Sequence, residues 1–379
     1  MVTDLSTLHP LNVLEISKKR LHQNAQTLIN INPSIKISPV LKSNAYGHGI
    51  EIIGKELDSY NFPFYCVNSL PEAVALRNAG VKTDILIMGY VHPDNLKEAQ
   101  WDFIFAAFDL QFAQLVNQYQ NNPRVHLNVE TGLHRDGVDF LRFEEMLHEL
   151  QKLEKLKIEG LMSHMAYSNE PGSDTTQKQL ENFKLAKQMV KDAGIEPQWF
   201  HWGGSLALLN DLASEVNVVR CGKAFFGIAL NISYSGDKKE EPEYMSKFNL
   251  VMKLKTQVAQ VKTIQPGDTV SYSDMFRADK PMTIGIIPTG YNDGIDRRLI
   301  NKGKVIVQGK ACNYLGVIAM NVTVIDLTEV ENPKPGMEVI IYSDDPKDPN
   351  TFDNSAAMCA TLPQDLVLHL PKDLVRKLV

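Results

Sequence analysis

The chain has 379 residues, of which 44% are hydrophobic and 22% are charged, and its formal net charge is −6. This length can supply two ordinary domains, and the composition is that of a soluble globular protein. The negative charge argues against nucleic acid or an anionic membrane as the main partner. No run of about 18 apolar residues is present, and the N-terminus lacks the basic segment and apolar core of a signal peptide. The four cysteines are scattered without a CxxC pair, so we expect a reduced, cytoplasmic protein that holds no zinc ribbon and no other metal.

The first part of the chain alternates short apolar segments with amphipathic ones. The apolar segments predict eight strands, at residues 35–42, 62–69, 84–89, 102–109, 124–130, 157–164, 197–203 and 217–222. Helices are predicted between them, among others at 50–57, 70–80, 110–120, 140–153 and 177–194. This alternation is typical of parallel strands, and eight of them favour an α/β fold, a closed (β/α)8 barrel of the TIM type over residues 1–240. An open doubly wound sheet is the alternative, but no G-x-G-x-x-G follows the first strand, which weakens a dinucleotide-binding interpretation.

The character of the sequence changes after about Gly227. Segments rich in β-branched residues occupy 250–264, 283–291, 304–320, 321–327 and 337–343, and turns such as QPGD separate them. Such segments favour strands joined by tight turns. We therefore predict a second, mainly β domain over residues 241–379.

Polar residues gather where the predicted barrel strands end, and chemistry in such barrels takes place at the C-terminal ends of the strands. The set consists of Lys42, Arg135, His164, Ser205, Arg220, Gly222 and Lys223. Each residue also has an ordinary structural explanation, because a lysine can be solvated, a histidine can be hydrogen-bonded in a core and a serine can cap a helix. Their shared position at one end of the barrel favours a single ligand site.

The segments that follow the last two barrel strands predict a phosphate site. Gly203, Gly204 and Ser205 would offer backbone N–H groups and a hydroxyl where a helix begins, and Gly222 with Lys223 would add a close backbone approach and another donor. A lysine amine across the barrel mouth from a phosphate suggests a phosphorylated aldehyde held as a Schiff base, and pyridoxal 5'-phosphate fits that description. Arg220 would then face the pyridine nitrogen.

The motifs around these residues resemble those of the alanine racemase family. The segment KSNAYGHG at 42–49 is similar to the family's lysine motif, and ETGLHRDG at 130–137 is similar to D-T-G-M-x-R-x-G. The segments GLMSHMA, HWGGS, RCGKAFFG, GYNDG and GVIAMN follow in the same order. The resemblance covers nearly the whole chain and implies a barrel followed by a β domain.

The resemblance implies a role for each matched barrel residue. Lys42 would hold pyridoxal phosphate covalently and act as one catalytic base. Tyr46, Ser205, Gly222 and Lys223 would bind the phosphate, as implied by their matched positions. Arg220 would face the pyridine nitrogen, and because arginine keeps its proton, that nitrogen would stay unprotonated. His164 would support Arg220, and Arg135 would orient the substrate carboxylate.

Three β-domain residues, Tyr291, Met320 and Asn321, match family residues that complete the active site of the neighbouring subunit. The resemblance therefore implies a head-to-tail homodimer with shared active sites and a small amino acid as substrate.

The chain departs from the family pattern at several positions. The family's second base is a tyrosine in a motif close to V-S-Y-G-x-T-Y. The segment VSYSDMF at 270–276 aligns with this motif and places Phe276 at the position of the base. Tyr272 or Asp274 would restore a base if the alignment is shifted. A racemase needs a proton donor or acceptor on each face of the α-carbon, and phenylalanine carries no proton. The other departures are Asn128, Val317, Asn321 and Gln364, which stand where a lysine, an arginine, an aspartate and a tyrosine are usual.

Three functions compete at this point. The leading hypothesis is an amino-acid racemase that converts L-alanine to D-alanine, which serves peptidoglycan synthesis. The second is another reaction at the α-carbon on the same cofactor, such as retro-aldol cleavage or decarboxylation, because one base suffices there. The third is a pyridoxal-phosphate-binding relative without catalysis, against which the retained Arg135 and Met320 argue, since a carrier needs no substrate clamp.

Overall fold

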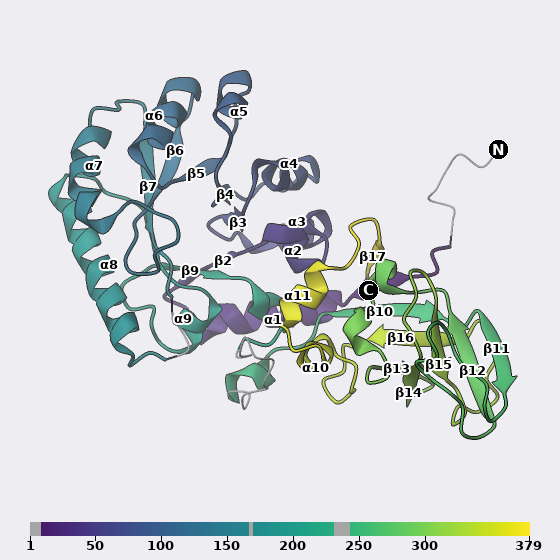
Figure 1. Ribbon diagram of the computed structural model, residues 1–379. Helices are drawn as coiled ribbons and strands as arrows, with labels where there is room; N and C mark the ends of the chain where they lie inside the picture. Colours follow the sequence, from purple (N-terminus) through teal and green to yellow (C-terminus); the bar gives the residue numbers. More distant parts are fainter. Residues whose placement is uncertain (1–8, 167–169, 231–242) are drawn as a thin grey trace. The chain divides into compact units, whose positions relative to one another are not determined.

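The computed structural model describes residues 9–166, 170–230 and 243–379. The chain divides into two compact units, one made of Ala25–Phe225 and the other of Phe226–Val379 together with the N-terminal residues up to Asn24 (Figure 1). The sequence suggested a division at residue 240 with the N-terminus in the barrel. The contacts instead divide the chain after Phe225 and group the N-terminal residues with the β-rich unit, because the first strand pairs there.

The unit Ala25–Phe225 is a barrel of eight parallel strands among its described residues, as predicted. The strands are β2 (Lys36–Pro39), β3 (Tyr65–Val67), β4 (Ile85–Ile87), β5 (Ile104–Ala107), β6 (Arg124–Asn128), β7 (Lys157–Met162), β8 (Trp199–His201) and β9 (Val218–Cys221). Strands β3 to β8 form one sheet, and β9 pairs in parallel with β2. A bridge between Val40 and Cys66 joins β2 to β3, and Asn217 N–H donates to Phe200 O at 3.1 Å between β9 and β8. Strands β3, β4 and β5 are short and wholly buried, which explains why they read as continuous apolar runs.

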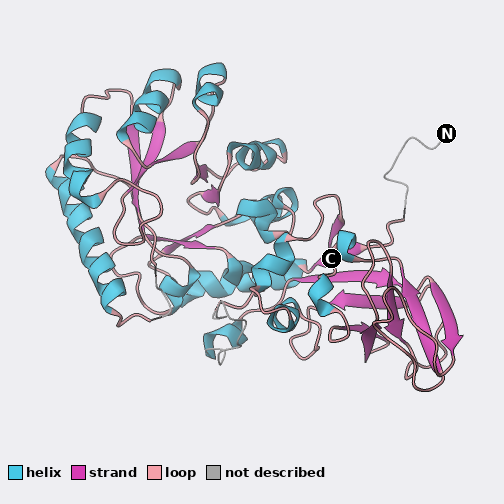
Figure 2. Ribbon diagram, viewed as in Figure 1, coloured by secondary structure: helices cyan, strands magenta, loops and turns pink. Residues whose placement is uncertain are grey.

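Helices cover the outside of these strands (Figure 2). They are α1 (Lys18–Ile31), α3 (Ile50–Leu57), α4 (Leu70–Asn78), α5 (Pro93–Glu98), α6 (Leu110–Tyr119), α7 (Phe143–Leu150), α8 (Asp174–Asp192) and α9 (Ser205–Leu209), and the division between the units falls inside α1. Side chains cap several of them, since Asp109 accepts from Phe112 N–H and Ser173 from Thr176 N–H. Gly194, with φ +69°, follows the end of α8. In the described part of the chain, no helix is long and apolar enough to cross a membrane.

The second unit is built on a nine-stranded sheet. Its strands, in sheet order, are β11 (Gln260–Ile264), β12 (Met282–Ile287), β15 (Thr323–Asp326), β14 (Lys310–Leu315), β13 (Lys304–Val307), β16 (Glu338–Tyr342), β10 (Met252–Gln257), β1 (Val13–Ile16) and β17 (Val375–Leu378). Strand β1 lies between β10 and β17, antiparallel to the first and parallel to the second. Helices α10 (Phe352–Met358) and α11 (Pro363–Leu368) pack on its core, where the rings of Tyr342 and Phe352 stack with centroids 4.2 Å apart. The predicted mainly β C-terminal domain is therefore confirmed.

Candidate active site

Lys42 lies just beyond β2 and begins a turn of unusual hand. The segment α2 (Lys42–Tyr46) is not a right-handed helix, because Ser43, Asn44, Ala45 and Tyr46 have φ between 50° and 56°. Left-handed backbone costs an ordinary residue about 1–2 kcal/mol, so the surrounding structure must hold this turn in place.

The motif after Lys42 supplies part of that support. The side-chain oxygen of Asn44 accepts from Ile50 N–H at 2.9 Å, which ties the turn to the start of α3. Nδ1 of the buried His48 lies 3.0 Å from Ala45 O and 2.8 Å from Tyr46 O. Gly47 and Gly49 also have positive φ, 80° and 97°. The residues SNAYGHG at 43–49 therefore stabilise a left-handed turn that starts at Lys42.

The amine of Lys42 lies in a positive, partly buried environment. Burial lowers its pKa below the usual lysine range, and the nearby charges of Arg135 and Arg220 lower it further. Glu72 and Cys66 act in the opposite direction. The amine is therefore neutral at a lower pH than an ordinary lysine, which suits a nucleophile towards an aldehyde and a proton acceptor.

Arg220, on β9, is buried at 4% exposure and is surrounded by neutral acceptors. Its guanidinium donates to Nδ1 of His201 at 2.5 Å, to Ser163 O at 2.7 Å and to Nδ1 of His164 at 3.0 Å. Burial and the charge of Arg220 lower the pKa of His164 to about 3, and they hold that of His201 well below its usual range. Both imidazoles are therefore neutral and can accept from the arginine.

A second buried histidine, His126 on β6, continues this chain. Because Nδ1 of His201 accepts from Arg220, we assign its proton to Nε2, which then donates to Nδ1 of His126 at 2.8 Å. Gly160 on β7 makes room for the His126 ring, since a Cβ there would lie 2.5 Å from it. Burial and the charges of Arg124 and Arg220 lower the pKa of His126 to about 3, so this ring is also neutral.

The predicted phosphate-binding residues lie close to Arg220. A Cβ at Gly222 would lie only 2.6 Å from the Tyr46 hydroxyl oxygen, so the glycine lets the backbone after β9 approach that tyrosine. Burial, with a smaller effect of Cys66, raises the pKa of Tyr46 to about 12, so its hydroxyl keeps its proton and can donate. Ser205, which is 7% exposed, begins α9, and Lys223 begins a short 3₁₀ turn directly after Gly222. These hydroxyl and backbone donors, with a close approach that only glycine permits, fit a phosphate group.

Arg135 lies on a loop that returns over the end of β6. The Glu130 carboxylate accepts hydrogen bonds from the N–H groups of Gly132, Leu133 and Arg135. Burial raises the pKa of Glu130, but backbone hydrogen bonds of this kind outweigh burial and lower it overall. Nε of Arg135 donates to the Asp136 carboxylate at 3.0 Å, and the Arg135 side chain is 57% exposed. An open cavity of about 880 Å³ lies beside Arg135. The arginine is thus charged and accessible.

Asn128, at the end of β6, is buried at 4% exposure beneath this loop. Its carbonyl oxygen accepts from Val138 N–H at 2.8 Å where the loop returns. Within the described part of the chain, the backbone of Asn128 is therefore what connects it to the loop that carries Arg135.

The three β-unit residues of the predicted site lie together within their own unit. Tyr291 N–H donates to Ala319 O at 3.1 Å, and Nδ2 of Asn321 lies 3.4 Å from the Asp293 carboxylate. The side chains of Tyr291 and Met320 are 39% and 55% exposed, and the Arg297 guanidinium lies over the Tyr291 ring, 5.2 Å from its centroid. This surface combines two exposed large side chains with polar and charged groups that a second molecule can contact.

In the segment 270–276, which is expected to carry the second base, the motif alignment places Phe276 at the base position, but the exposed aromatic residue is Tyr272. Phe276 is half-buried and packs against a cluster made of Val270, Ala278, Met282, Ile284 and Leu315. Tyr272 is 68% exposed, and the adjacent Ser271 hydroxyl donates to Val317 O at 2.9 Å. Asp274 is paired with Arg277 at 2.6 Å. Tyr272 is therefore a surface residue of this segment, whereas Phe276 packs against the edge of an apolar cluster.

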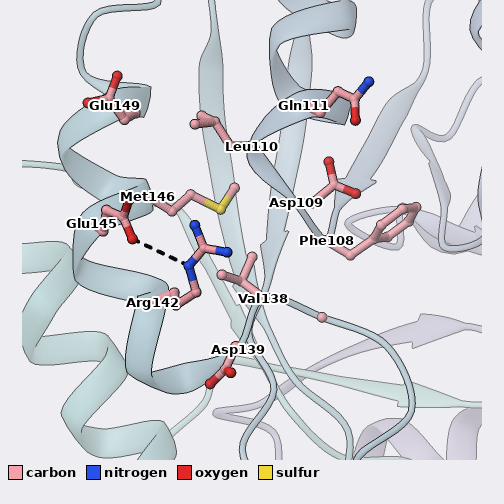
Figure 3. A pocket seen from close by; sticks show the side chains of 11 residues that line it. Phe108, Asp109, Leu110, Gln111, Val138, Asp139, Arg142, Glu145, Met146 and Glu149 are labelled. Carbon is pink, nitrogen blue, oxygen red and sulfur yellow. Dashed lines mark hydrogen bonds and ion pairs between the residues drawn. The ribbon is translucent and has the colours of Figure 1, made fainter.

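Another cavity, of about 430 Å³, lies between α6 and α7, outside the strands (Figure 3). Arg142 donates to Glu145 at 3.4 Å across one side of it, and Met146, Leu110 and Val138 give it an apolar part. None of the residues predicted for the site lines this cavity. The candidate active site is therefore the group around Lys42 and Arg220.

Some neighbours of the site were not identified from the sequence. His201 ends β8 just as His164 follows β7, so its place at a strand end was a usable signal. Cys66 on β3 lies close enough to Lys42 and Arg220 for their charges to act on its thiol, but burial raises its pKa to about 12. Glu72 on α4 contacts the turn after Lys42 from 29 residues away in sequence, and no local pattern reveals that contact.

Comparison with known proteins agrees with this geometry. Residues 16–229 match the alanine racemase N-terminal domain, and residues 251–378 match the alanine racemase C-terminal domain. Alanine racemase 2 of Caldanaerobacter subterraneus subsp. tengcongensis is 28% identical over 96% of this chain and 95% of its own length. The alanine racemase of Sorangium cellulosum is 32% identical, with 79% of each chain covered.

Solved structures show the same fold. The alanine racemase of Clostridium difficile 630 superposes with a TM-score of 0.88 at 24% identity, covering 98% of this chain and 96% of that one. That of Bartonella henselae, solved with covalently bound pyridoxal phosphate, gives a TM-score of 0.82 at 22% identity, covering 98% and 100%. Two domain matches that span most of the chain, with a relative at 32% identity, show that this protein belongs to the alanine racemase family, a family of pyridoxal-phosphate-dependent isomerases.

Proposed function

We propose that this protein interconverts L- and D-alanine with pyridoxal 5'-phosphate bound at Lys42. The observation that carries the proposal is the Lys42 amine, which lies at the end of a barrel strand with a lowered pKa and within reach of the charges of Arg220 and Arg135. Family membership supports the cofactor and the substrate class.

The residues around Lys42 suit this cofactor. Tyr46, Ser205, Gly222 and Lys223 would bind its phosphate through hydroxyl and backbone donors, and Gly222 allows the close approach to Tyr46. Arg220 would donate to the pyridine nitrogen, with His164 and His201 holding the guanidinium in place. When bound, the cofactor withdraws electrons from the substrate α-carbon and so makes its hydrogen acidic.

Substrate binding would depend on Arg135. A guanidinium binds a carboxylate in a bidentate manner, and the accessible Arg135 lies beside a cavity large enough for a small amino acid. Asp136 accepts from Nε, so a substrate carboxylate would bind the terminal NH₂ groups of the guanidinium.

Racemisation needs two groups that exchange a proton with the α-carbon from opposite faces. Lys42 would serve one face. We assign the other to Tyr272, because its phenol is exposed whereas Phe276 packs into the β unit and carries no proton. We further propose that Tyr272, Tyr291, Met320 and Asn321 reach the barrel of a second copy, so that the functional unit is a homodimer with shared sites.

We place this reaction in the cytoplasm, where D-alanine would be supplied to peptidoglycan synthesis. The four cysteines are all free and buried, which suits a reducing compartment.

A chiral assay of the purified protein with added pyridoxal phosphate tests the proposal. We expect D-alanine to form from L-alanine and L-alanine from D-alanine, and we expect Lys42→Ala to abolish both. Exchange of the α-hydrogen with deuterium, followed in parallel, separates the alternatives. Exchange without inversion would favour a different reaction at the α-carbon, and absence of both, with cofactor bound, would leave only a cofactor-binding protein.

A further inference from the structure

We propose that Glu72 is a positioning residue for Lys42, acting through the left-handed turn that follows the lysine. The inference rests on the proposed function, because it concerns how the cofactor-binding lysine is presented.

Glu72, in the first turn of α4, accepts hydrogen bonds from two different parts of the barrel. One carboxylate oxygen, Oε1, accepts from the backbone N–H of Ser43 at 2.5 Å. The other, Oε2, accepts from Asn68 N–H at 2.9 Å and from Ser69 N–H at 3.2 Å. The Ser69 bond is the reciprocal half of a capping box and serves α4. The Ser43 bond does nothing for α4, and it links that helix to the peptide group that joins Lys42 to Ser43.

This contact lies where the backbone needs support. Ser43 has φ 55° and is the first of four consecutive non-glycine residues in the left-handed region. Asn44 and His48 hold the far end of the turn, towards α3. Glu72 holds the near end, next to Lys42, through its bond from Ser43 N–H.

The residue before Lys42 is also held by a neighbouring element of the barrel. Leu41 N–H donates to Cys66 O at 2.8 Å, so β3 fixes the chain immediately before Lys42 and α4 fixes it immediately after. Position and direction of the lysine side chain are thereby set by a strand and a helix, which are rigid elements. Glu72 is also a negative charge that partly offsets the effect of Arg135 and Arg220 on the pKa of the Lys42 amine.

A carboxylate is required for this geometry. Its two oxygens accept from both sides, whereas the amide of a glutamine would turn an NH₂ group towards one set of backbone donors. Hydrogen bonds to charged groups that are lost in this way typically cost 10- to 100-fold in an equilibrium.

The test compares Glu72→Gln with Asp58→Asn in the full chain. Asp58 is a matched control, because its carboxylate accepts two backbone N–H bonds, from Lys82 and Thr83, compared with three for Glu72, and those bonds lie away from the turn after Lys42. Pyridoxal phosphate is titrated into cofactor-free protein, and lysine-bound cofactor is measured by visible absorbance and by borohydride trapping at Lys42. Thermal unfolding of the cofactor-free proteins measures the structural cost of each substitution.

We expect Glu72→Gln to weaken cofactor binding about 10-fold or more, while Asp58→Asn loses similar thermal stability without loss of binding. Equal binding by Glu72→Gln and wild type, or equal loss in both variants, would overturn the proposal.

A second variant tests whether Glu72 acts through the left-handed turn. Adding Ser43→Gly to Glu72→Gln should restore part of the binding, because glycine adopts positive φ without strain. No recovery would show that Glu72 does not act through the turn.

Amide hydrogen exchange of the cofactor-free protein gives a readout that does not depend on the proposed function. Residues 43–46 should exchange faster in Glu72→Gln than in wild type, and unchanged exchange would refute the role of Glu72 in holding the turn. If wild type binds no pyridoxal phosphate, the proposed function fails, and the exchange experiment still decides the role of Glu72.

Discussion

Replacing Tyr272 and Phe276 separately should show which of them supplies the second proton. Tyr272→Phe removes one hydroxyl from a residue that is 68% exposed, so folding should not change measurably. A positioned acid or base contributes about 10²–10⁴-fold to a proton-transfer step. We therefore expect the rate of alanine inversion to fall by about that factor. Phe276→Leu, the matched control, retains an apolar side chain against Val270 and Leu315 and should leave inversion unchanged.

The assay follows two processes in deuterated water, inversion of configuration and replacement of the α-hydrogen by deuterium. In Tyr272→Phe, one enantiomer should exchange faster than it inverts, because Lys42 still serves one face. Phe276→Tyr should add nothing, since its new hydroxyl would lie near an apolar cluster and could cost about 1–3 kcal/mol of unfolding free energy if unsatisfied. Full inversion by Tyr272→Phe would refute this reasoning, and so would a Phe276→Tyr variant that inverts faster than wild type.

Three further predictions concern the barrel. Lys42→Ala should eliminate the visible absorbance of bound cofactor, and borohydride should attach the cofactor to Lys42 alone in wild type, as peptide mapping can check. Gly222→Ala should weaken cofactor affinity without unfolding the barrel, because its Cβ would lie 2.6 Å from the Tyr46 hydroxyl oxygen; unchanged affinity in a calorimetric titration would place the phosphate elsewhere. The pKa of Lys42 is lowered, so its neutral, reactive form persists to lower pH than in other lysines, and in the cofactor-free protein an amine-labelling reagent used as the pH is raised from 7 to 9 should modify Lys42 before surface lysines; labelling in the reverse order would contradict this.

The barrel strands could be predicted from the sequence because each is a short apolar run between polar turns. Strand β1 could not be assigned to the β unit in this way, since VLEI at 13–16 reads equally well as the first strand of a barrel. Its place is decided by pairing with β10 and β17, which lie more than 230 residues further along the chain. Long-range pairing of this kind leaves no trace in local periodicity.

The candidate site shows the same division between local and long-range information. Lys42, Arg220 and Gly222 could be predicted as site residues from their positions at strand ends, because an amine, a guanidinium and a glycine at such positions suit cofactor binding. The choice between Tyr272 and Phe276 could not be made by motif register, since both are aromatic residues at plausible spacing. Packing distinguishes them, because one ring faces a cluster of apolar side chains and the other is exposed.

Burial lowers the pKa of Lys42 most, and the charges of Arg135 and of Arg220, at the centre of the site, lower it further. Among the described residues no carboxylate forms an ion pair with Arg220, and its neighbours include two histidines whose pKa values are lowered by burial and by Arg220 itself. Neutral imidazoles accept its hydrogen bonds without neutralising its charge, so the positive field of Arg220 still reaches Lys42. That field favours the unprotonated amine, which is the form that can attack an aldehyde or accept a proton. A carboxylate beside Arg220 would weaken this field, and a neutral histidine is therefore the better partner for an arginine whose charge helps to lower the pKa of a nearby lysine.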